Sequence, residues 1–157
     1  MGTEENSRIC HEFVAAHRAH DIPGMVALLA DDITIRSAAG RDKPPFRGKE
    51  EAAAHWRSMY TTFPDFRMDV IEATAVGDMV LAEIEHGGTM MGAMKGASED
   101  WEATHYPFSQ LKDRGPTGKS YRVQSVFRMD FSNGKIRSIM SYWDTMSMLS
   151  QLGLLPD

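Results

Sequence analysis

The chain has 157 residues, of which 42% are apolar and 25% charged, a composition typical of one soluble globular domain. That balance excludes disordered, collagen-like and coiled-coil proteins, and the formal net charge of −5 argues against nucleic acid or an anionic membrane as partner. No apolar run approaches the roughly 20 residues of a membrane-spanning helix, and the acidic start is unlike a basic signal peptide. The single Cys10 fits a reducing compartment. We therefore expect one cytoplasmic domain over residues 1–157.

The N-terminal part of the chain predicts two helices and a strand. Apolar residues recur at helical spacing over residues 6–20, which predicts the first helix. A second, short helix begins at Asp21-Ile22-Pro23, because Asp caps helices and Pro is tolerated in a first turn, and it ends at Asp31-Asp32. Residues 33–37 alternate β-branched side chains and predict a strand. The buried stripe of the first helix contains Ile9, Phe13, Ala16 and His17.

The rest of the chain predicts a third helix and an antiparallel meander. A Gly- and Pro-rich loop over residues 39–47 leads to a helix that starts at Gly48 and ends before Pro64, since proline disfavours helix at the preceding residue. Ser132-Asn133-Gly134 is a strong hairpin signal. A last helix begins at Asp144, with Gly153 at its C-terminal cap. Strands are predicted over residues 66–75, 79–86, 120–131 and 135–144.

Helices followed by strands indicate an α+β fold, with a pocket between a curved sheet and the helices. Residues 87–117 are too long for a simple hairpin loop, and residues 93–115 read as an insertion. The insertion contains Trp101 and His105 in an aromatic-rich stretch. We expect it to be a lid over the pocket, and the alternative is an arm that contacts a dimer partner.

Several short phrases occur together in a characteristic order. They are Asp31-Asp32-Ile33, Gly48-Lys49-Glu50, Phe63-Pro64-Asp65, Gly77-Asp78, Pro116-Thr117-Gly118-Lys119, Gly134-Lys135-Ile136, Tyr142-Trp143-Asp144 and Gln151-Leu152-Gly153. The ordered set resembles the SnoaL-like polyketide cyclases of the nuclear-transport-factor-2-like (NTF2-like) superfamily, from about Asp21 to Leu155. The stretch Gly118–Asp144 is also similar to limonene-epoxide hydrolase. The resemblance implies an NTF2-like cone, with a curved antiparallel sheet, three N-terminal helices on its concave face and a homodimer formed through the sheet.

Asp144 is the first candidate catalytic residue. Alternation along the last strand predicts that it shares a face with Ile136, Met140 and Tyr142, so an inward face would place its carboxylate in the pocket. Burial there would raise the pKa of the carboxyl group and make it a usable acid or base. In related families an Asp at the matching position acts in acid–base chemistry. The alternative is that Asp144 only caps the final helix, and the two roles are compatible.

His86 is the second candidate, because it ends a strand with one apolar face and could share a proton with Asp144. A structural histidine is the alternative. Limonene-epoxide hydrolases carry Arg-x-Asp where this chain has Ile84-Glu85-His86, so the water-activating set of that family is incomplete. SnoaL-like sequences often have a histidine where this chain has Met90. The resemblance therefore implies that a proton relay has moved to His86 or His105, or is absent.

The remaining predicted site residues bind or orient the substrate. Tyr60 could orient a carbonyl group through its hydroxyl. The predicted substrate-binding residues are Trp56, Ile35, Ser37, Ile84, Met90, Trp101, His105, Ser125, Phe127, Met140 and Tyr142. No paired Cys, spaced His or Gly-rich phosphate loop indicates a metal or nucleotide, so we expect no cofactor.

These features together predict a cofactor-independent cyclase or isomerase. It would act by acid–base chemistry on a hydrophobic, oxygenated small molecule, a polyketide- or terpenoid-like intermediate in natural-product biosynthesis. One alternative is an epoxide hydrolase or lyase in the same pocket. Another is a non-catalytic, ligand-binding NTF2-like dimer.

Overall fold

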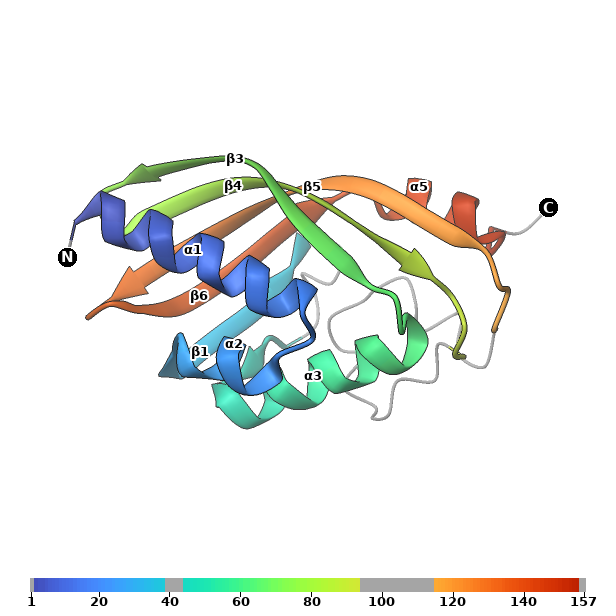
Figure 1. The fold of residues 1–157 in the computed structure, drawn as a ribbon, viewed down its shortest axis with the longest axis horizontal. Coiled ribbons are helices and arrows are strands. Elements are labelled where there is room, and N and C mark those ends of the chain that lie inside the picture. Colours follow the sequence, from blue (N-terminus) through green and yellow to red (C-terminus); the bar gives the residue numbers. More distant parts are fainter. Residues whose placement is uncertain (1, 39–43, 94–114, 156–157) are drawn as a thin grey trace.

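The protein folds as a curved sheet with α1, α2 and α3 on its concave side, as predicted (Figure 1). The structure is a computed structural model that describes residues 2–38, 44–93 and 115–155. The helices are α1 (Thr3–Arg18), α2 (Ile22–Ala27), α3 (Gly48–Thr62) and α5 (Thr145–Leu152). The strands are β1 (Leu29–Ser37), β2 (Phe46–Arg47), β3 (Arg67–Val76), β4 (Met79–Thr89), β5 (Ser120–Ser132) and β6 (Lys135–Trp143).

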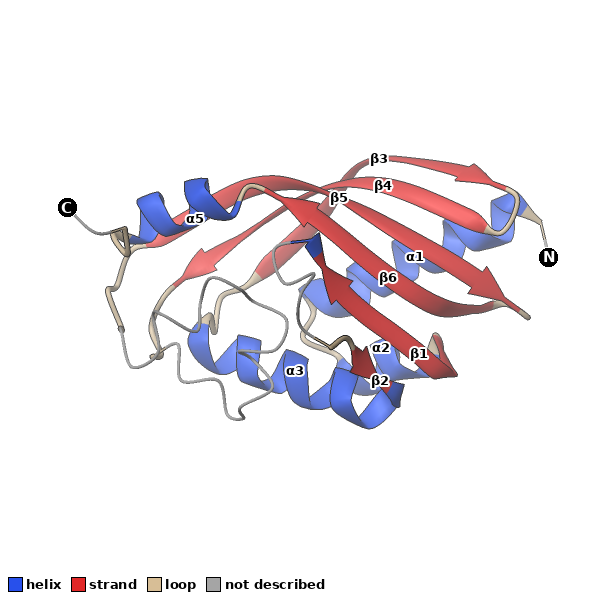
Figure 2. Cartoon of the chain, turned by 180° about the vertical axis from the view of Figure 1, so that it is seen from behind, coloured by secondary structure: helices blue, strands red, loops and turns tan. Residues whose placement is uncertain are grey.

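The strands of the described ranges lie in the order β2-β1-β6-β5-β4-β3. The strands β3 to β6 form the predicted antiparallel meander. The sheet is not wholly antiparallel, because β1 pairs with β6 in parallel and β2 adds a short edge beside β1. A long stretch of chain separates β1 from β6, which is the condition for a parallel pair. Figure 2 shows β1 and β2 on the same side of the molecule as α3.

The second helix is shorter than predicted. It begins as expected, with the Asp21 carboxylate accepting a hydrogen bond from the Gly24 amide at 2.9 Å. It ends at Ala27, however, and Leu29 already belongs to β1. Leu29 pairs with Ile136 of β6 and is fully buried there. Pairing with a distant strand therefore overrides the local helical tendency, which is a weak determinant of structure.

Turn chemistry at the ends of the elements agrees with the prediction. Asn133 and Gly134 both have positive φ, at 49° and 70°, which is the conformation of a tight hairpin turn between β5 and β6. Gly153 ends α5 in the left-handed region, with φ of 70°. Its neighbour Leu154 donates a backbone hydrogen bond to Leu149, which satisfies a carbonyl of the last helical turn.

A β-bulge in β6 changes which residues face the helices. Phe131 pairs with Ile136, but the next residue of β5, Asp130, pairs with Ser138, so Arg137 is an extra residue in β6. One inserted residue exchanges the two faces of a strand beyond it. Ile139, Ser141 and Trp143 therefore face inward. The predicted alternation through Met140, Tyr142 and Asp144 as one inward face with Ile136 is wrong for this reason, and Tyr142 is 49% exposed.

The core lies between the helices and the concave face of the sheet. Ile9 and Phe13 of α1 and Trp56 of α3 pack there against inward residues of β4, β5 and β6. Cys10 is a free thiol in this core, and burial raises its pKa to about 11. No helix among the described residues combines the length and the apolar character that crossing a bilayer requires.

Candidate functional site

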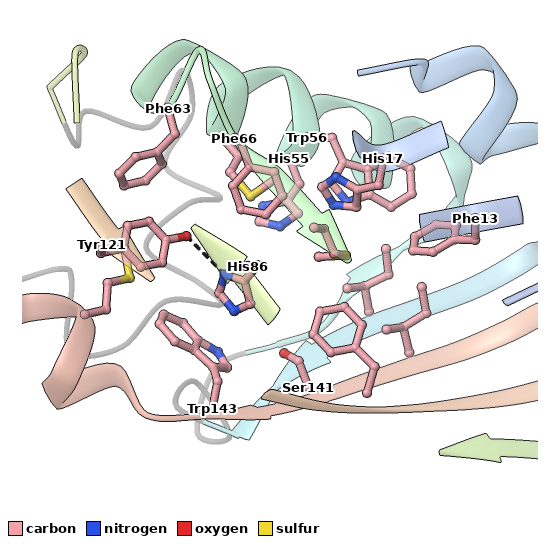
Figure 3. Close-up of a pocket in the computed structure, with 16 residues that line it drawn as sticks. Phe13, His17, His55, Trp56, Phe63, Phe66, His86, Tyr121, Ser141 and Trp143 are labelled. Carbon is pink, nitrogen blue, oxygen red and sulfur yellow. Dashed lines mark hydrogen bonds between the residues drawn. The ribbon is translucent and has the colours of Figure 1, made fainter. Parts of the chain in front are cut away.

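A cavity of about 90 Å³ lies between the helices and the sheet (Figure 3). Its wall is mostly aromatic and aliphatic, with Phe13 and Trp56 on the helix side and Phe127 and Ile139 on the sheet side. Such a wall favours an apolar ligand, and a few polar groups then set its orientation. The polar side chains of the wall are His17, His55, His86, Tyr121 and Ser141, together with the indole of Trp143.

His86 and Tyr121 form a hydrogen-bonded pair inside the cavity. His86 follows Ile84 on the inward face of β4, and its Nδ1 lies 3.1 Å from the Tyr121 hydroxyl on the neighbouring β5 (Figure 3). Burial lowers the pKa of His86 to about 4, so the imidazole is neutral at pH 7. Burial, with the nearby charge of Asp65, raises the pKa of Tyr121, so its hydroxyl stays protonated.

His17 places a second imidazole in the wall, from α1. Its Nδ1 lies 2.8 Å from the hydroxyl of Tyr60, which is also 3.1 Å from the backbone oxygen of His17. Burial is the main cause that lowers the pKa of His17 to about 3. The nearby His86 and His20 lower this pKa further, and interaction with its own backbone carbonyl raises it in part. His17 is therefore neutral at pH 7, like His86.

Two further polar groups stand at the cavity wall. His55 of α3 stacks on Phe46, with ring centroids 4.5 Å apart. The indole of Trp143 donates a hydrogen bond to Ser37 across the β1–β6 pair, at 3.1 Å, and its ring packs edge-on against His86. Trp143 reaches this position because the bulge in β6 turns it inward. The described residues include no group of three or more His, Cys, Asp and Glu placed to hold a metal ion.

Comparison with known families decides the identity of the fold. Residues 10–139 match the SnoaL-like domain. The chain belongs to this family. Its membership confirms the resemblance drawn from the ordered phrases of the sequence. No curated protein is significantly similar to this SnoaL-like domain in sequence.

Several solved structures share the fold of this SnoaL-like domain. A proposed SnoaL-like polyketide cyclase from Jannaschia sp. CCS1 has a TM-score of 0.76 at 14% sequence identity. The alignment covers 98% of this chain and 94% of the Jannaschia chain. IdmH, a proposed polyketide cyclase from Streptomyces antibioticus, has a TM-score of 0.70 at 21% identity, covering 94% and 98%. An epoxide hydrolase of M. tuberculosis, similar to limonene-epoxide hydrolase, has a TM-score of 0.68 at 18% identity, covering 95% and 90%. Identities this low show the fold alone.

The predicted substrate-binding residues of this SnoaL-like domain divide into three groups. Trp56, Ile35 and Phe127 line the cavity, and their contact with a substrate stays a prediction. Others are buried but not in the cavity wall, namely Ser37, Ile84, Met90 and Ser125. Met140 and Tyr142 lie on the face of β6 that points away from the cavity, so their predicted role in substrate binding is wrong. Trp101, His105 and nearly all of the predicted insertion over residues 93–115 lie outside the described residues.

Asp144 does not point into the cavity of this SnoaL-like domain. Its side chain is exposed, and its carboxylate accepts a hydrogen bond from the Ser147 amide at 2.9 Å as the N-terminal cap of α5. The predicted inward orientation is therefore wrong, and the capping alternative is the observed one. Tyr60 does not line the cavity either, because its hydroxyl is held by His17. In the described part of the chain, no Asp or Glu lines the cavity.

Apart from His86, the polar residues of the cavity wall were not predicted as site residues, namely His17, His55, Tyr121, Ser141 and Trp143. The sequence does indicate that His17 is buried, since it shares the apolar stripe of the first helix with Ile9 and Phe13. The contact of Tyr121 with His86 depends on the register between β4 and β5, which the sequence of either strand alone does not give. Trp143 was assigned to the wrong face, because the bulge at Arg137 exchanges the two faces of β6 beyond it.

Proposed function

We propose that this SnoaL-like domain is a cofactor-independent cyclase or isomerase that acts by acid–base chemistry on a hydrophobic, oxygenated small molecule. The observation that supports the proposal most is the His86–Tyr121 pair inside an otherwise largely apolar cavity. A neutral imidazole that is held by a protonated phenol can donate a hydrogen bond to a carbonyl oxygen that becomes negatively charged in an enolate. In a site that excludes water, hydrogen bonds to the developing negative charge usually make the largest single contribution to the rate enhancement.

The substrate class follows from the cavity wall. Aromatic side chains such as Phe66, Trp56 and Trp143 suit a flat or cyclic carbon skeleton. The few polar groups suit carbonyl or hydroxyl oxygens on that skeleton. We propose a polyketide- or terpenoid-like intermediate of natural-product biosynthesis, which agrees with the description of two structural neighbours as proposed polyketide cyclases.

A ligand-binding protein without catalysis is the second candidate, and the position of Asp144 favours it. The carboxylate expected as the base is an exposed helix cap, and no Asp or Glu in the described residues replaces it in the cavity wall. The same observation weakens the epoxide hydrolase alternative, because that chemistry needs a group that activates water. A neighbour with that activity shares only the fold.

Proton exchange separates the first two functions. In D₂O, the enzyme should replace the C1 protons of 2-tetralone, a bicyclic ketone, with deuterium faster than buffer does, as followed by ¹H NMR. Exchange at the buffer rate, combined with a cavity-directed shift of protein resonances by 2-tetralone, would instead identify a binding protein. Exchange at the buffer rate without any resonance shift would count against both functions.

Removing the Asp144 carboxylate should change stability and not catalysis. Asp144→Ala is expected to lower the free energy of unfolding by about 1 kcal/mol, because α5 loses its cap. The exchange rate of 2-tetralone should stay within about twofold of wild type, since the carboxylate lies outside the cavity. Asp21→Ala, which removes the same type of cap from α2, is the matched control. A loss of exchange in the Asp144 variant alone would restore this residue to the catalytic set.

The outer face of the sheet supports the proposed homodimer. Val126 and Tyr142 are neighbours across β5 and β6 and are 40% and 49% exposed, and Leu81 on β4 is 41% exposed. A sheet face with exposed apolar groups is commonly covered by a second copy related by a twofold axis. Light scattering at micromolar concentration should give the mass of a dimer. Val126→Glu should give a monomer, whereas Val76→Glu, at the end of β3, should not.

A further inference from the structure

We infer that His17 is the base of the cavity, with an unprotonated Nε2 available to the substrate and Tyr60 as the residue that positions its ring. His86 has the opposite role, with a protonated Nε2 that donates to the carbonyl oxygen. The inference rests on the proposed function, because it assigns the proton acceptor that the exposed position of Asp144 leaves open. It follows from the hydrogen-bond partners of the two imidazoles.

The partners of Tyr60 determine which nitrogen of His17 carries the proton. The Tyr60 hydroxyl lies 2.8 Å from Nδ1 of His17 and 3.1 Å from its backbone oxygen. The backbone oxygen can only accept, as can the Met25 sulfur at 3.9 Å, so the hydroxyl proton points to these acceptors and not to Nδ1. The hydroxyl oxygen then accepts a hydrogen bond from Nδ1–H. Nε2 therefore keeps a free lone pair.

Tyr60 is itself fixed, as a positioning residue must be. Its ring stacks on His20 with centroids 4.0 Å apart and an interplanar angle of 9°. His20 is held in turn by a hydrogen bond between its Nε2 and the backbone oxygen of Phe66, at 2.8 Å. The hydroxyl of Tyr60 consequently has little freedom to leave His17, and the tautomer of His17 is set by the fold.

The partner of His86 selects the other tautomer. Among the described residues, the Tyr121 hydroxyl has one hydrogen-bond partner, Nδ1 of His86. A buried hydroxyl proton needs an acceptor, so Tyr121 donates to Nδ1. The proton of neutral His86 is then on Nε2. Two tyrosines thus hold two cavity histidines in opposite tautomers, one as a base and one as a donor.

Both imidazoles are within reach of one small molecule. The Phe66 ring lies 5.1 Å from the His17 ring and 5.8 Å from the His86 ring, as centroid distances, and all three line the same cavity. Figure 3 shows His17 beside Trp56 on the helix side and His86 beside Trp143 on the sheet side. A ketone that covers Phe66 can place its α-carbon toward His17 and its oxygen toward His86.

The step conserves atoms and charge without any co-reactant. The lone pair of His17 Nε2 takes the α-proton, the C–H bond breaks, and its electron pair moves onto the carbonyl oxygen as an enolate. The oxygen accepts a hydrogen bond from Nε2–H of His86. The negative charge of the enolate stabilises the neighbouring imidazolium of His17. This attraction compensates for the low basicity of a buried histidine. Return of the proton to another carbon completes an isomerisation; attack of the enolate carbon on a second carbonyl, with proton transfer to the new alkoxide, completes a cyclisation.

Nitrogen NMR of the ¹⁵N-labelled protein tests the tautomers directly. Long-range ¹H–¹⁵N spectra at pH 7 distinguish a protonated from an unprotonated imidazole nitrogen. We expect Nδ1–H for His17 and Nε2–H for His86, with the signals assigned through His17→Gln and His86→Gln. Tyr60→Phe should change only the His17 pattern, and Tyr121→Phe only that of His86. The same tautomer at both histidines would overturn the inference.

Kinetics and alkylation separate this inference from the proposed function. His17→Gln should slow proton exchange of 2-tetralone at least about 100-fold, while His11→Gln, on the exposed side of the same helix, should not. Tyr60→Phe should lower kcat about tenfold with KM unchanged, because the ring is present but no longer fixed in one tautomer. Wild-type exchange that survives His17→Gln would disprove the base assignment and leave the function intact.

The alkylating ketone 2-bromoacetophenone gives a readout that needs no turnover. Nε2 of His17 should displace bromide, forming a C–N bond as the C–Br bond breaks, and peptide mass spectrometry should locate the adduct on His17 and not on His86. An adduct on His17 together with exchange at the buffer rate would support the free Nε2 and count against the proposed function. An adduct on His86 alone would contradict the assignment.

Discussion

His86→Leu is expected to slow the exchange of C1 protons in 2-tetralone by at least about 100-fold, the usual cost of removing one donor from a developing oxyanion. Leucine fills a similar volume but cannot donate to the enolate oxygen, and it also removes the acceptor of the Tyr121 hydroxyl. Tyr121→Phe keeps the imidazole in place and should therefore cost less. ¹H NMR in D₂O measures both rates, with buffer alone as the reference.

The control for this experiment is a change of cavity wall without a change of chemistry. Met59 lines the same cavity and carries no exchangeable proton, so Met59→Leu should keep most of the activity. The double variant His86→Leu, Tyr121→Phe shows whether the two residues act as a pair, since a shared role makes their effects non-additive. A His86 variant that exchanges protons at the wild-type rate would contradict its catalytic role.

The elements of the fold were predictable because their signals are local. The hairpin at Asn133–Gly134 and the cap at Gly153 depend on backbone conformations that few residue types adopt easily. The identity of one or two residues is therefore enough to predict them. The early start of β1 was not predictable in this way. Leu29 joins the strand because of its pairing with Ile136, which lies more than a hundred residues further along the chain.

The candidate site was harder to predict, because it depends on strand faces. The inward face of β4 has no irregularity between Val80 and His86, and His86 was placed correctly. In β6 the inserted Arg137 exchanges the faces, so Asp144 was expected where Trp143 stands. The sequence does contain a weak signal of the bulge, since Ile136 and Ile139 are both strongly apolar but three residues apart. Strict alternation does not allow that spacing on one face.

The pairing of each histidine with a tyrosine could not be deduced from sequence. The contact between His17 and Tyr60 joins two helices whose relative rotation is set by packing against the sheet, through rings such as Phe66. The helical stripe of α1 does predict that His17 is buried. A buried histidine with no charged partner stays neutral, so burial alone was enough to mark it as a group worth testing.

Acidification should destabilise the protein in the range where histidine titrates. The pKa values of His17 and His86 are lowered from 6.5 to about 3 and about 4, so between these values and 6.5 the unfolded chain binds more protons than the folded protein. Stability therefore rises with pH across this range and falls as the pH is lowered. Between pH 7 and pH 5 each histidine accounts for about 2 kcal/mol, or about 4 kcal/mol together, a large part of the stability of an ordinary domain.

Urea titrations at pH 7 and pH 5 measure this loss. The window lies above the ordinary pKa of Asp and Glu, so carboxylates such as Asp65 contribute little to the difference. His17→Gln with His86→Leu should remove most of the pH dependence, because the two imidazoles whose pKa values burial lowers are gone. His11→Gln should keep it, because His11 is exposed on the same helix as His17. Equal stability of the wild type at both pH values would mean that these imidazoles are solvated or already charged, which would also count against a dry cavity as the site of catalysis.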